Sequence, residues 1–217
     1  MKKIILTTFS LIAALWVNAQ SVNPQRGLDI VVPDSDKTTS SDYYTGKTEV
    51  RSSFETYIIV NSQSNSKYGY LFLSNKKNRC FGPNRINPID KKTGTKLYFD
   101  DLPALRPDIP ALDAIVKEVF PHCYFSNDSD DILLMITMAV DPATHKVLEV
   151  EIGFEDINKN KQILAIPPYK IRQLEKLVIE KVTAQFTLDY CDYPDWVKNA
   201  SYLYSGTYMK RIANLNL

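Results

Sequence analysis

The run from Ile132 to Val140 constrains the fold more than any other part of the chain, because it is apolar at every position except Thr137. It is too short to span a bilayer, and its composition is typical of a β-strand buried on both faces. At the edge of a sheet such a strand would pair with other chains and aggregate. We therefore expect it at the centre of a sheet.

The residues that follow predict a hairpin. Residues 141–146 form a turn with Pro142 at its second position, and His145 occupies a place where the left-handed backbone conformation is common. The next strand alternates: its inward positions are Leu148, Val150, Ile152 and Phe154, and its outward positions are Glu149, Glu151 and Gly153. The alternation alone explains the two glutamates, as the polar face of a half-exposed strand.

Two helices flank this hairpin. The first is capped by Asp108 and ends at Pro121, and its apolar face consists of Leu112, Ile115, Val116, Val119 and Phe120. The second begins near Pro168, and its buried stripe consists of Ile171, Leu174, Val178 and Val182. A final strand from Ala200 to Ile212 would carry Tyr202, Tyr204 and Tyr208 on one face. The order helix, hairpin, helix, strand predicts an α+β fold, an antiparallel sheet with both helices packed on one face.

A smaller β-rich segment is predicted before the first helix. Phe54 to Val60 and Tyr68 to Leu73 have strand composition, and the polar residues between them are typical of a turn. The predicted organisation is a signal peptide (1–19), a polar, loosely packed N-terminal arm with at most one edge strand (20–53), the β-rich segment with a basic loop (54–105) and the α+β module (106–217).

The first residues predict export. Lys2 and Lys3 precede an apolar stretch, and Val17-Asn18-Ala19 places small residues before a cut at Gln20. Removing the two lysines changes the formal charge from +1 to −1, so the chain as a whole has no attraction for nucleic acid or anionic membranes. We expect a periplasmic or secreted protein without a membrane span after cleavage, without a nucleic-acid partner and without a cofactor.

Half of the mature chain resembles the C-terminal domain of TonB-type energy transducers. The resemblance covers residues 108–212 and is carried by ILLMITMAVDPATHKVLEVEIGF followed by PPYKIRQLEKLVIEKVTAQF. Energy transducers keep their N-terminal helix as an anchor and carry a Pro-rich spacer, whereas here the apolar stretch ends at a cleavage site. The resemblance therefore implies a similar module reused in a free protein. The whole chain also resembles uncharacterised small secreted proteins of Gram-negative gut bacteria, in which Gln commonly follows the cut.

The chain has three cysteines, an odd number for an oxidising compartment. Cys123 and Cys191 each follow a predicted helix, so we favour a disulfide between them and a free Cys80. A thiol hydrolase would then have to use Cys80 with one of the two histidines, but no family signature surrounds Cys80. Sequence patterns for metal sites and serine nucleophiles are absent, so we predict no metal and no catalytic residue.

Two features could bind a partner. The loop from Lys76 to Lys96 holds seven cationic residues against Asp90 alone, among them Lys76, Lys77, Arg79 and Arg85, and could attract an anionic glycan, a lipid headgroup or an acidic protein. Aromatic residues crowd the C-terminal end, and Trp196, Tyr202, Tyr204 and Tyr208 are typical of an interface, a sugar-stacking platform or a sheet face filled beneath a loop.

We therefore expect a non-enzymatic binding or interaction module whose partner is a protein or glycan of the cell envelope. The alternatives are a cell-wall or glycan-directed hydrolase and an inhibitor or immunity-type partner protein. Two carboxylates facing each other across a cleft would favour the hydrolase.

Overall fold

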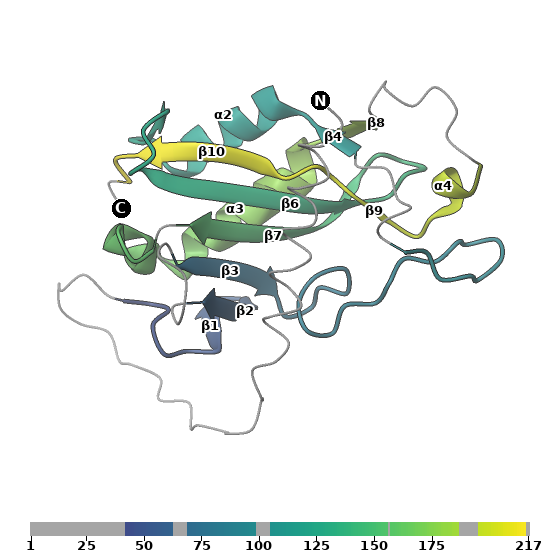
Figure 1. Ribbon diagram of the computed structural model, residues 1–217, viewed down its shortest axis with the longest axis horizontal. Helices are drawn as coiled ribbons and strands as arrows, with labels where there is room; N and C mark the ends of the chain where they lie inside the picture. Colours follow the sequence, from purple (N-terminus) through teal and green to yellow (C-terminus); the bar gives the residue numbers. More distant parts are fainter. Residues whose placement is uncertain (1–41, 63–68, 99–104, 156, 187–194, 216–217) are drawn as a thin grey trace. The chain divides into compact units, whose positions relative to one another are not determined.

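The computed structural model describes residues 42–62, 69–98, 105–155, 157–186 and 195–215, and residues 41–217 form one compact unit. The predicted signal peptide lies outside the described residues. The main sheet consists of β1 (Glu49–Ser52), β2 (Glu55–Ser62), β3 (Tyr70–Asn75), β5 (Tyr124–Ser126), β6 (Ile132–Val140), β7 (Val147–Glu155), β9 (Leu203–Tyr204) and β10 (Tyr208–Ala213). Their order is β1-β2-β3-β7-β6-β10-β5, with β9 paired to β6 (Figure 1). All the described pairs of this sheet are antiparallel.

The helices are α2 (Ile109–Val119), α3 (Pro168–Lys181) and the short α4 (Asp195–Asn199), and a 3-10 turn η2 spans Lys161–Ala165. A separate two-stranded ladder joins β4 (Leu105–Pro107) to β8 (Ala184–Phe186). The α+β class predicted from the sequence is confirmed. In the described part of the chain, none of the helices combines the length and the hydropathy that a membrane-spanning helix requires.

Both long helices pack on one face of the sheet. Asp108 caps α2 as predicted, and its Oδ1 accepts a hydrogen bond of 3.1 Å from the Ala111 amide. The predicted apolar faces are buried, and α3 lies on β7 while α2 packs beside α3 (Figure 1). The buried stripes of the two helices and the sheet face beneath them form the main hydrophobic core.

The strand β6 is central, between β7 and β10, as expected. The expected burial on both faces holds for residues 138–140, which are completely buried, but not for the first half of the strand. Ile132, Leu134 and Ile136 are almost completely buried, whereas Leu133 and Met135 are only half-buried, because the helices cover one face of the sheet.

The β6–β7 hairpin contains a bulge that the alternation does not predict. Ala139 pairs with Glu149 and Val140 pairs with Val147, so Leu148 is the extra residue of the β-bulge and is 43% exposed instead of pointing inward. In the turn before it, His145 has a φ of 59°, the left-handed conformation expected from the sequence.

The predicted hairpin of residues 54–73 is β2–β3, and it continues the main sheet because β3 pairs with β7. Gly153 on β7 lies opposite Phe72 on β3, and a Cβ atom at Gly153 would be only 2.6 Å from the Phe72 ring. The aromatic ring therefore fills the space above the glycine, and this contact packs β3 closely against β7 of the β6–β7 hairpin.

Two parts of the chain differ from expectation near its ends. Tyr44, in the predicted polar arm, is fully buried, and its hydroxyl donates to the Ile166 carbonyl at 2.6 Å. The predicted final strand is split into β9 and β10. Ser205 lies at the interruption: its amide donates to the Met138 carbonyl, and its hydroxyl oxygen accepts from the Met138 amide. Tyr202 and Tyr204 therefore pack beneath residues 80–86, whereas Tyr208 packs against α2.

Candidate functional site

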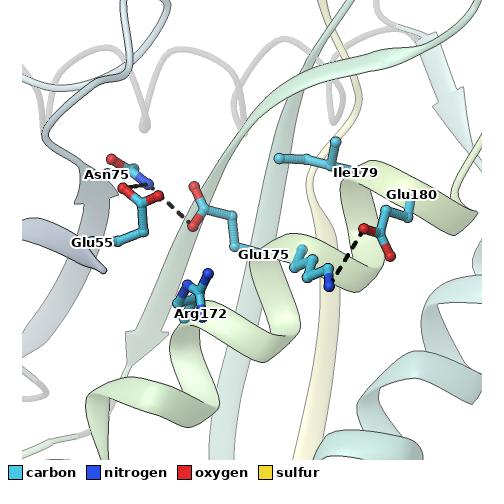
Figure 2. A pocket seen from close by; sticks show the side chains of 7 residues that line it. Glu55, Asn75, Arg172, Glu175, Ile179 and Glu180 are labelled. Carbon is cyan, nitrogen blue, oxygen red and sulfur yellow. Dashed lines mark hydrogen bonds and ion pairs between the residues drawn. The ribbon is translucent and has the colours of Figure 1, made fainter. Parts of the chain in front are cut away.

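A pocket of about 210 Å³ lies beside α3, between this helix and the ends of β2 and β3. We refer to it as the α3 pocket. Its lining residues are Glu55, Asn75, Arg172, Glu175, Lys176, Ile179 and Glu180. Figure 2 shows Glu55, Asn75 and Glu175 pointing towards one another, with Arg172 one turn before Glu175 on α3.

Glu175 forms the buried base of the α3 pocket, with 6% of its surface exposed. Its Oε2 accepts hydrogen bonds from the Tyr57 hydroxyl and, at 3.3 Å, from Asn75 Nδ2. Burial raises the pKa of Glu175 above the ordinary glutamate value, although these hydrogen bonds and the Arg172 charge act in the opposite direction. The network attaches α3 to β2 and β3 through one carboxylate.

Glu55 is the second carboxylate of the α3 pocket. Its Oε2 accepts from the same Asn75 amide at 3.4 Å, and Lys77 Nζ lies 3.0 Å from it. The hydrogen bond from Lys77 is the main reason why the pKa of Glu55 lies below its ordinary value. One amide thus separates two carboxylates whose pKa values are displaced in opposite directions.

Aliphatic and cationic groups line the α3 pocket, and the aromatic ring of Phe54 contacts one of them, Arg172. Phe54 is 76% exposed, and the Arg172 guanidinium lies 4.9 Å from the centre of its ring. Ile179 is 37% exposed, and Lys176 forms an ion pair with Glu180 at 3.7 Å. Carboxylates, an amide and a guanidinium beside an aromatic ring can bind a polar, hydroxyl-rich molecule. No cluster of metal-binding side chains occurs in the described part of the chain.

This site could not be predicted from the sequence, because its residues come from three elements far apart in the chain. One signal was present. Glu175 lies one turn after Ile171 and one turn before Val178, so a charged residue occupies the buried stripe of α3. Such a residue must find polar partners, and Tyr57 and Asn75 supply them.

The structure brings the two sequence-predicted binding features together. Residues 76–96 cross the sheet face opposite the helices, where Glu149 accepts from the amides of Arg79 at 2.8 Å and of Cys80 at 2.6 Å. Tyr204 donates to the Cys80 carbonyl and Tyr202 donates to the Ile86 carbonyl, each at 2.5 Å. These two tyrosines fill the sheet face beneath a loop, one of the alternatives considered from the sequence.

The other candidate residues are placed as follows. Tyr208 is buried and donates to Asp113 at 2.7 Å, and the side chain of Trp196 in α4 lies outside the described residues. Lys76 pairs with Glu49 at 2.8 Å and Lys77 with Glu55. A binding role for these residues stays a prediction.

The loop changes the environment of the outward-facing glutamates. Glu151, expected at the surface, is 8% exposed and accepts from Ser74 Oγ at 2.7 Å, because residues 76–96 fold over this face. Burial raises the pKa of Glu151 to about 7, opposed by Ser74 and Arg85.

The predicted disulfide is not seen in the structure. Cys80 and Cys123 are both free, buried thiols, and Cys191 lies outside the described residues. Burial, followed by the charge of Glu149 and a hydrogen bond to it, raises the pKa of the Cys80 thiol far above its usual range. A thiol held in its protonated form is a poor nucleophile.

Comparison with solved structures finds a similar fold in a DUF5043 family protein from Bacteroides uniformis ATCC 8492, whose crystal structure has a resolution of 1.85 Å. The TM-score is 0.52 and the sequence identity 18%, with 82% of this chain and 92% of that chain covered. The likeness concerns the fold. No family model and no curated protein sequence matches this chain. The resemblance of residues 108–212 to TonB-type transducers therefore stays a prediction.

Proposed function

We propose that this chain is an exported, non-enzymatic binding module and that the α3 pocket holds a polar glycan fragment of the cell envelope. The observation that carries the proposal is the buried Glu175 at the base of a pocket walled by Glu55, Asn75 and Arg172. Planar amide, carboxylate and guanidinium groups can each hydrogen bond two neighbouring hydroxyl groups, and Phe54, which contacts Arg172, offers an exposed ring for stacking. Export rests on the predicted cleavage before Gln20.

Binding without chemical change is supported by how the carboxylates are used. The amide of Asn75 lies between Glu55 and Glu175 and donates to both, and Glu55 is also paired with Lys77. In a glycoside hydrolase the scissile bond occupies the space between two carboxylates. Here a side chain of the protein already occupies that space.

Retention on an array of muropeptides, N-acetylhexosamine oligomers and uronic-acid oligomers tests this function. We expect at least one class to bind, and Arg172→Ala to weaken binding about tenfold through loss of a charge-assisted hydrogen bond. Lys181→Ala, at an exposed position on the same helix, is the matched control and should bind as the unaltered chain does. Retention of no glycan, or equal retention by both variants, would overturn the proposal.

A glycan hydrolase is the second candidate, and one observation favours it. The pKa of Glu175 is raised while that of Glu55 is lowered. Opposite shifts of this kind are expected for a protonated general acid and an ionised second carboxylate in a glycoside hydrolase. Release of new reducing ends from the array glycans, abolished in Glu55→Gln, would establish hydrolysis in place of simple binding. Intact glycans after prolonged incubation would exclude hydrolysis of these substrates.

A further inference from the structure

Residues 76–98 carry exposed cations and exposed apolar side chains on one loop, which adjoins the α3 pocket through the Lys77–Glu55 ion pair. Arg79, Lys92 and Lys96 are exposed and form no ion pair within the described part of the chain. Three other cations of the loop, Lys76, Lys77 and Lys91, are paired with carboxylates of other segments. The unpaired positive charge of the loop is thus carried by Arg79 near its start and by Lys92 and Lys96 near its end.

Apolar side chains accompany these cations. Ile86 is 52% exposed, Ile89 is 36% exposed and Tyr98 is 68% exposed. Ile89 and Lys96 are cross-strand partners in an isolated antiparallel bridge, so their side chains lie on the same face. Tyr98 follows Lys96 by two residues, and the alternation of an extended chain places it on that face as well.

The loop is held in place by contacts with the rest of the unit. The Lys91 amide donates to the Asn199 carbonyl and the Ser201 amide donates to the Ile89 carbonyl, each at 2.8 Å, which ties the loop to the end of α4. Glu149 and the two tyrosine hydroxyls fix its other end. Figure 1 shows the loop reaching past the sheet on the side where α4 lies.

We propose that this loop docks the protein on an anionic lipid surface, with Ile86, Ile89 and Tyr98 entering the interfacial region and Arg79, Lys92 and Lys96 contacting the headgroups. Cations alone would suit any acidic partner, but exposed aliphatic and aromatic side chains beside unpaired cations match the layered chemistry of a bilayer surface. Because the loop is already ordered by its contacts, docking requires little additional ordering of the backbone.

Sedimentation with lipid vesicles tests this docking surface. The chain from Gln20 onward is used, because the apolar residues 1–19 would themselves enter lipid and because the whole compact unit from residue 41 is retained. We expect binding to vesicles of equimolar phosphatidylcholine and phosphatidylglycerol, weakened by added salt, and little binding to phosphatidylcholine alone.

Variants of the loop locate the surface. Lys92→Ala and Lys96→Ala should each lower the partition coefficient about fivefold, and Ile86→Ser should lower it about tenfold. The matched controls Lys181→Ala and Ile109→Ser, at exposed positions on α3 and α2, should bind as the parent does. The proposal fails if the parent does not bind anionic vesicles, if the loop variants bind as well as the controls, or if a soluble anionic glycan is retained while vesicles are not.

Discussion

Tyr57 on β2 donates its hydroxyl hydrogen to the buried carboxylate of Glu175 on α3, and this bond connects the sheet to the helix at the base of the α3 pocket. The two residues are separated by 118 positions in the sequence. Any change at this pair should therefore affect both the stability of the fold and the shape of the pocket.

Removing the Tyr57 hydroxyl should destabilise the protein. Tyr57→Phe leaves the ring in the core but deprives Glu175 of its closest donor, so that Asn75 is its remaining partner, and losing such a buried hydrogen bond costs about 1–3 kcal/mol. Urea unfolding should show a lower free energy of unfolding by that amount. Tyr169→Phe is the matched control. Tyr169 is 56% exposed on α3, the helix that carries Glu175, and its substitution should have no measurable effect. Equal stability of Tyr57→Phe and the parent would show that the Tyr57–Glu175 bond does not stabilise the fold.

The buried Glu151 should make stability decrease as the pH rises. Its pKa is about 7 in the folded protein, above the ordinary value of 4.5. Between pH 4.5 and pH 7, Glu151 is therefore protonated in the folded state and ionised in the unfolded state. Its stabilising contribution is complete below pH 4.5 and is lost as the pH rises through 7, by about 3 kcal/mol in total.

Glu151→Gln keeps an acceptor for Ser74 and removes the titration. We expect the difference in unfolding free energy between parent and variant to change by about 3 kcal/mol between acidic and mildly alkaline pH. Glu180→Gln, at an exposed position on α3, is the control and should follow the parent. A parent and a Glu151→Gln variant with parallel pH profiles would contradict the assignment.

The contact between Gly153 and Phe72 should be sensitive to a single methyl group. Gly153→Ala places a Cβ atom 2.6 Å from the Phe72 ring and 3.2 Å from the Met135 methyl carbon, which forces the ring to move at a cost of about 1–3 kcal/mol. Thermal or urea unfolding measures this loss.

A second substitution tests whether Phe72 is responsible. Phe72→Ala removes both ring carbons, Cδ1 and Cε1, that the new Cβ atom meets, so Gly153→Ala should cost clearly less in that background. If the two substitutions are additive, the loss comes from another source, such as reduced backbone freedom at position 153.

The elements that could be predicted from the sequence are those whose pattern is local. The faces of α2 and α3, the cap at Asp108 and the β6–β7 hairpin follow from spacing within each segment. The pairing of β3 with β7 could not be predicted in this way, because it joins residues about eighty positions apart and both strands also have other partners. The bulge at Leu148 was missed because strict alternation has no place for an extra residue.

The candidate site was missed for a related reason. Glu55 and Asn75 have ordinary surface character in the sequence, and only their position opposite Glu175 gives them a role. Likewise, Glu149 and Glu151 have the pattern of a solvent-facing pair, but a long loop covers them. When a distant, irregular loop covers a polar sheet face, neither the loop nor the strand carries a residue pattern that predicts the burial.

Cys80 should react slowly with thiol reagents in the folded protein, because it is buried and its pKa is raised by burial and by Glu149. Glu149→Ala removes the acceptor of the Arg79 and Cys80 amides as well as the charge, so the loop should open more often and Cys80 should be labelled about tenfold faster. Glu149→Gln separates the two causes, since it removes the charge but keeps an acceptor oxygen, and should give a smaller increase that comes from the lower pKa alone. Peptide mapping by mass spectrometry assigns the label, and the buried thiol of Cys123 serves as the internal control whose rate should not change. A parallel rise at Cys123 would indicate general unfolding, and an unchanged rate at Cys80 would show that Glu149 does not hold the loop.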